Sequence, residues 1–126
     1  SQLQLTLPPE WKVYFTLWIQ FIAARAGEAP SAEHTDLLRR LGASPNWWGK
    51  LASFGAGDLN YDDMMSVASS LGEETEVLYY EATRLYIAGE REAAERQFRR
   101  VLETNMVSFY EFEMARKLLI NQAKSP

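Results

Sequence analysis

The sequence offers few side chains with the chemistry of a catalytic or metal-binding site. It contains no cysteine and a single histidine, His34. Disulfides, thiolate zinc sites and cysteine nucleophiles are therefore excluded, and one histidine does not supply the several ligands that a metal site needs. We interpret His34 as a surface residue and predict neither a metal site nor a bound cofactor.

Two pairs of adjacent carboxylates are the remaining candidates for acid–base catalysis. They are Asp62-Asp63 and Glu73-Glu74. Neighbouring residues on a helix point about 100° apart, whereas acid–base catalysis needs two carboxyl groups that face each other across a substrate. Both pairs fall where helices are expected to begin, and acidic side chains there interact favourably with the helix dipole. We therefore predict that the protein is not an enzyme.

The glycine-rich stretch GKLASFGAGD, residues 49–58, does not have the pattern of a phosphate-binding loop. It lacks the order G-x-x-x-x-G-K-[ST], and no strand is expected before it. The formal net charge of −4 also argues against a nucleic-acid binder, which normally carries a basic face. We predict no phosphate-loop site and no nucleic-acid partner.

The length and apolar content of the chain fit one domain with a substantial core, since 47% of its 126 residues are apolar. The most apolar run, residues 13–24, is twelve residues long, whereas a membrane-spanning helix needs about 20. We predict a core helix there and no transmembrane segment. A targeting segment upstream of Ser1 is compatible with the sequence, so the compartment stays open.

Helix-start and helix-stop residues divide the chain into seven expected helices. An extended arm over residues 1–9 ends in two prolines, and the helices follow with short links. Their expected ranges are about 10–26, 31–41, 44–56, 58–71, 73–88, 91–105 and 108–122. Ser31 and Ser44 are expected to cap the second and third helices, and Gly72 to end the fourth. No stretch alternates like a strand, so the fold is predicted to be all-α.

The helices recur as a repeat marked by a glycine followed by an acidic residue. Gly27, Gly57 and Gly89 are 30 and 32 residues apart, and glycine in this place ends a helix in the left-handed conformation. Aromatic or aliphatic residues fill eleven of twelve places at matching distances before these glycines. Ten places before the glycines stand Leu17, Trp47 and Tyr79, and nine places before them stand Trp18, Trp48 and Tyr80. Six places before them stand Phe21, Leu51 and Thr83, and three places before them stand Ala24, Phe54 and Tyr86. Three of these registers share one helix face, which predicts three helical hairpins and a final helix.

Residues 76–105, EVLYYEATRLYIAGEREAAERQFRRVLETN, resemble a tetratricopeptide repeat (TPR). Ala82 and Ala94 stand where that family has small residues, because its two helices cross closely there, and a glycine stands at the turn. Glu81 departs from the pattern, since leucine is usual in its place. The two earlier units are more degenerate, and the resemblance extends over about residues 12–120.

This resemblance implies a right-handed solenoid of three helix pairs plus a C-terminal capping helix. The expected units span about residues 10–42, 43–72 and 73–106, followed by the final helix at 108–122 and a tail at 123–126. The pattern is similar to divergent bacterial envelope lipoproteins of the TPR type, some of which act as adaptors. It therefore implies a non-catalytic protein-interaction module or scaffold, in the bacterial periplasm or envelope, with the cytoplasm as the alternative.

In TPR scaffolds, one register of the first helix faces a concave groove that holds a partner peptide or helix, and large aromatic residues anchor it. The resemblance places these residues in that groove: Leu17, Phe21, Trp47, Leu51, Phe54, Tyr79, Thr83 and Tyr86. Polar residues beside the groove are expected to set the register of the partner; they are Arg25, Lys50 and Glu76. Trp47 is also explained as a core residue, and both interpretations stay open.

Self-assembly is the alternative function. The final helix carries apolar residues on one side, among them Phe109, Phe112 and Leu119. This helix either covers the last unit, as solenoids require, or binds a second copy of the chain. In the second case, the N-terminal arm and the final helix form a homodimer.

Overall fold

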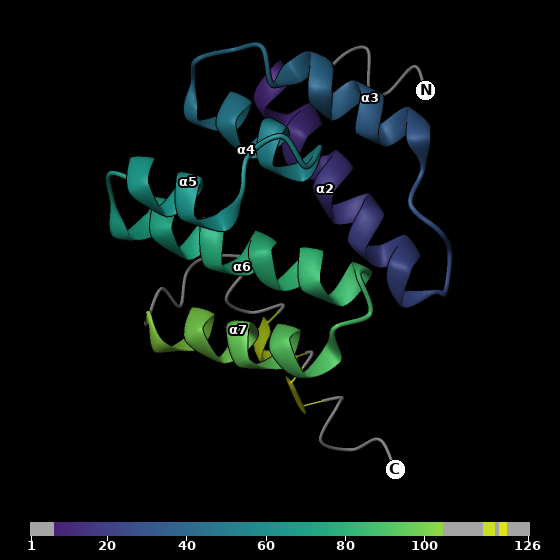
Figure 1. Cartoon of the computed structure of the whole chain (residues 1–126), viewed down its shortest axis with the longest axis vertical. Helices are drawn as coiled ribbons and strands as arrows, with labels where there is room; N and C mark the ends of the chain where they lie inside the picture. Colours follow the sequence, from purple (N-terminus) through teal and green to yellow (C-terminus); the bar gives the residue numbers. More distant parts are fainter. Residues whose placement is uncertain (1–6, 105–114, 118, 121–126) are drawn as a thin grey trace. The chain divides into compact units, whose positions relative to one another are not determined.

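The computed structural model describes residues 7–104, 115–117 and 119–120, and every regular element in those ranges is a helix (Figure 1). The helices are α2 (Pro9–Arg25), α3 (Ala32–Leu41), α4 (Trp47–Gly55), α5 (Tyr61–Val67), α6 (Leu71–Ile87) and α7 (Arg91–Glu103). Residues 115–117 and 119–120 are also helical. The predicted all-α fold is confirmed for these residues, whereas most of the predicted arm and of the predicted final helix lies outside them.

Three helix ends repeat the same hydrogen-bonded geometry. Gly27, Gly57 and Gly89 follow α2, α4 and α6 with φ angles of 83°, 88° and 84°. At each end, the N–H groups of the glycine and of the next residue donate to carbonyl oxygens three and five residues earlier. These two bonds define a Schellman motif, which glycine completes without the steric cost of a side chain at positive φ. The predicted role of the three glycines is therefore confirmed.

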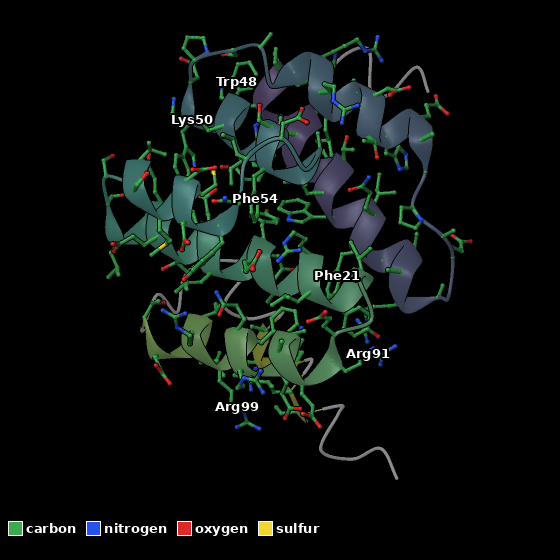
Figure 2. All side chains as sticks on the ribbon, viewed as in Figure 1. Phe21, Trp48, Lys50, Phe54, Arg91 and Arg99 are labelled. Carbon is green, nitrogen blue, oxygen red and sulfur yellow. The ribbon has the colours of Figure 1, made fainter. Side chains whose placement is uncertain are left out.

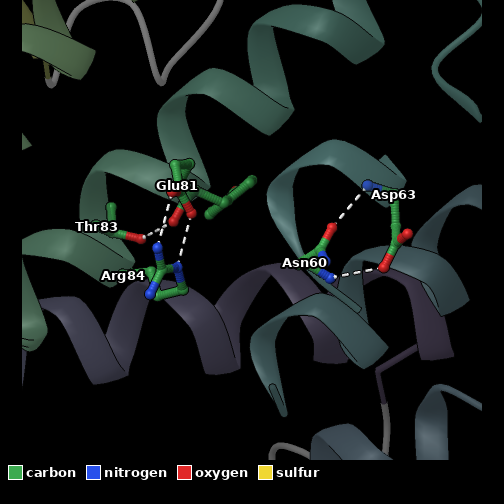
Figure 3. A network of polar contacts seen from close by, with 6 residues as sticks. Asn60, Asp63, Glu81, Thr83 and Arg84 are labelled. Atoms are coloured by element: carbon green, nitrogen blue, oxygen red, sulfur yellow. Dashed lines mark hydrogen bonds and ion pairs between the residues drawn. The ribbon is translucent and has the colours of Figure 1, made fainter. Parts of the chain in front are cut away.

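Side-chain caps fix the starts of α3 and α5, and the cap of α3 is the predicted Ser31. The Ser31 hydroxyl accepts a hydrogen bond from the N–H of His34 (3.4 Å) before α3. At α5, the Asp63 N–H donates to Asn60 Oδ1 (2.8 Å), and the Asn60 N–H donates to Asp63 Oδ2 (3.1 Å), as Figure 3 shows. This reciprocal pair is a capping box, so Asp63 has a structural role at a helix start.

The predicted start of the third helix is wrong. Asn46 occupies the N-cap position of α4, and Ser44 lies before it. The Ser44 hydroxyl accepts a hydrogen bond from the N–H of Asn46 (3.3 Å). Ser44 therefore closes the turn ahead of the helix, and it does not cap the first helical N–H groups.

The predicted boundary at Gly72 is also wrong, because α5 ends at Val67 and α6 begins at Leu71. The Ser70 hydroxyl accepts a hydrogen bond from the N–H of Glu73 (3.1 Å), which makes Ser70 the N-cap. Gly72 consequently lies in the first turn of α6. Helix N–H groups lack intrahelical partners there, and a capped serine start determines the boundary more strongly than the glycine does.

Contacts within the chain divide it into two compact units, Ser1–Met64 and Met65–Pro126. In the first unit, α2 packs against α3 and α4, and α3 packs against α4. In the second unit, α6 and α7 run antiparallel and pack against each other as a hairpin (Figure 1). The predicted division into three repeat units within one domain stays a prediction.

The core of the first unit depends on a close approach between α2 and α4. Val13 of α2, Leu38 of α3 and Leu51 of α4 are fully buried. A Cβ atom at Gly55 would lie 2.5 Å from Leu17 Cδ2, which is closer than carbon atoms approach without a shift. The lack of a side chain at Gly55 therefore permits this packing.

The α6–α7 hairpin has a core of small and aromatic residues. Ala82 and Ala94 are fully buried, at the two places where the TPR resemblance implies small side chains. Beside them, the rings of Tyr79 and Phe98 meet edge to face with their centroids 5.9 Å apart. This geometry is favourable for aromatic pairs, and it fixes α6 against α7.

Candidate interaction surface

Most of the predicted groove residues in the first unit are buried. The buried ones, each less than a tenth exposed, are Leu17 and Phe21 on α2 and Leu51 and Phe54 on α4. Trp47 is half-buried, and its indole N–H is buried with no hydrogen-bond partner among the described residues. Figure 2 labels Phe21 on α2 and Phe54 on α4. Packing in the core explains why these side chains are buried, and their role in partner binding stays a prediction.

The predicted groove residues in the second unit all lie on α6. Tyr79 and Thr83 are buried, with 1% and 6% of their surface exposed, and Tyr86 is half-buried. The Thr83 hydroxyl donates to the carbonyl oxygen of Tyr80 (2.9 Å), which satisfies it within the helix. The guanidinium carbon of Arg91 lies 4.2 Å from the centroid of the Tyr86 ring. Of these three residues, Tyr86 keeps the most accessible surface.

The polar residues predicted to set the register of a partner have different environments. Lys50 donates from Nζ to the carbonyl oxygen of Pro45 (3.1 Å), so it is held near the start of α4. Glu76 is buried, with 8% of its surface exposed. Arg25 is exposed in the last turn of α2. Among these residues, Arg25 has the best access to a partner.

The first helix carries an exposed apolar row that the repeat pattern did not predict. The row consists of Trp11, Phe15, Ile19 and Ile22, which are 47%, 38%, 40% and 58% exposed. At about 100° per residue, these side chains lie within an arc of about 80° around the helix axis. Val13, which is buried, lies on the opposite side. We call the four exposed residues the α2 face.

Aromatic contacts hold the rings of the α2 face in a fixed arrangement. The ring centroids of Trp11 and Phe15 are 6.0 Å apart, and those of Phe15 and Trp18 are 5.4 Å apart and nearly perpendicular. Trp11 and Tyr14 also lie within ring-contact distance, at 6.1 Å. Because the rings already pack on one another, a partner would meet a surface that needs little further ordering.

The α2 face differs from the scattered apolar residues of an ordinary surface. Single exposed apolar side chains are common in folded proteins, whereas large contiguous apolar patches are typical of interaction sites. A helix of this kind has apolar residues on two opposite faces, and one such face remains uncovered in the described part of the chain. In the sequence, the available signal was the spacing of residues 11, 15, 19 and 22, which is that of one helix face.

The ion pairs near these elements are structural. Arg84 donates to Glu81 at 2.6 and 2.8 Å within α6, and Figure 3 shows this pair. This hydrogen bonding is the main reason that the pKa of Arg84 is raised. Arg39 of α3 donates to Asp58 at 3.0 Å, and the hydrogen bond to that carboxylate likewise raises the pKa of Arg39. Both arginines are therefore paired with carboxylates of the same chain.

The carboxylate pairs considered for catalysis lie in first turns of helices. Asp62 and Asp63 lie in the first turn of α5, and Glu73 and Glu74 lie in the first turn of α6, as the helix dipole favours. Among the described residues, no group of three or more His, Cys, Asp or Glu side chains is placed to hold a metal ion. Within the same ranges, no helix has the length and apolar character needed to cross a membrane.

The TPR resemblance rests on the glycine stops and on the small residues of the α6–α7 hairpin, and the α2 face is an independent structural feature. No protein-family model, curated protein or solved structure matches this chain.

Proposed function

We propose that the chain is a non-catalytic protein-interaction module built from TPR-like helical hairpins that continue as a right-handed solenoid. The repeated glycine stops support the hairpin repeat, since the same two hydrogen bonds end α2, α4 and α6. The buried Ala82 and Ala94 support close helix packing in the α6–α7 hairpin, as the TPR pattern requires. Repeat scaffolds of this kind provide extended surfaces for other proteins.

The observation that carries the interaction role is the α2 face. Its four large apolar side chains are 38–58% exposed along a single helix. Covering apolar surface is favourable by about 25 cal/mol per Å², so a partner that removes this row from water gains binding free energy. Apolar anchors spaced by three and four residues along one helix are also the pattern by which helices dock against partner surfaces.

The accessible residues of the predicted groove can also contact a partner. Trp47 and Tyr86 are half-buried and can add contact area at the surface. The other six predicted residues are buried, and they support the helices from within. We therefore place the main contact of a protein partner on the α2 face.

Site-specific photo-crosslinking from position 15 tests this function in cells that express the chain natively. Phe15 is partly exposed and belongs to the α2 face, so we expect a photoreactive amino acid there to form covalent adducts with a protein. The matched control carries the same amino acid in place of Arg96, an exposed residue on α7. We expect no specific adduct from the control. Equal adducts from the two positions, or none from position 15, would contradict the proposal.

A further inference from the structure

We draw no further inference here: the strongest candidate, the exposed apolar row of Trp11, Phe15, Ile19 and Ile22 on helix α2, belongs to the surface already described, and nothing in the described part of the chain shows what covers it.

Discussion

At the scale of single residues, burial explains why aromatic and aliphatic side chains recur before each glycine stop. Tyr79 is 1% exposed and packs against the ring of Phe98, and Leu17 fills the space beside Gly55 in the first unit. Each group of packed helices needs large side chains in these registers to exclude water from its core. The repeat pattern therefore identifies core residues, whether or not the protein also has a groove.

Tyr79→Ala should lower the free energy of unfolding by about 3–5 kcal/mol, as truncation of a buried aromatic residue does. Ile22→Ala, on the α2 face, should change the stability of the dilute chain by less than about 1 kcal/mol, because Ile22 is mostly exposed. Urea unfolding followed by circular dichroism measures both values. If Tyr79→Ala unfolds like the unchanged chain but loses its crosslinked partner, Tyr79 is an anchor of the predicted groove.

At the scale of helices, the Schellman motifs fix where α2, α4 and α6 end. Gly89 has a φ of 84°, and a Cβ atom added there would meet nothing within 4 Å. A side chain at Gly89 would consequently destabilise the chain through the strained backbone conformation and not through crowding by other atoms. The same holds for Gly27 and Gly57, which have similar angles and the same open space.

Gly89→Ala should therefore destabilise the chain by about 1–2 kcal/mol, the cost of the left-handed conformation for a residue with a Cβ atom. Gly89→Asn should cost less, since asparagine adopts this conformation more readily. Thermal unfolding of the two variants at the same concentration gives the comparison. Equal stability of Gly89→Ala and the unchanged chain would show that the α6–α7 turn does not depend on this glycine.

Local sequence signals predicted the helix ends better than the helix starts. A glycine that follows a helix commonly ends it by adopting a positive φ, so the three helix ends could be predicted from the glycines and their spacing. A start depends on which hydroxyl or carboxamide reaches the free N–H groups, and neighbouring candidates compete. Ser70 acts as the cap before α6, whereas Asn46 holds the N-cap position expected for Ser44 before α4 without a side-chain hydrogen bond.

The α2 face could not be separated from the core by sequence alone. Residues 11, 15, 19 and 22 have the spacing of a buried stripe, and so do Val13, Leu17 and Phe21. Which stripe becomes covered depends on where α3 and α4 pack, and that is a tertiary property with no local signal. The sequence therefore predicted an apolar helix but not its uncovered face.

At the scale of the whole molecule, the two sets of apolar residues have different environments. The repeated registers build cores in the unit of α2–α4 and in the unit of α6 and α7, while the α2 face remains available to a partner. The absence of cysteine from the sequence permits a direct measurement of this availability, because one introduced cysteine gives a single labelling site.

A nitroxide spin label on a cysteine replacing Phe15 tests the central claim most directly. In the dilute, isolated chain, the label should be mobile in the electron paramagnetic resonance spectrum, because this side chain is partly exposed. It should become immobile when the chain is mixed with an extract of its native cells, whereas a label replacing exposed Arg96 should stay mobile. A label at position 15 that is immobile from the outset, or mobile under every condition, would contradict the assignment of the α2 face as an interaction surface.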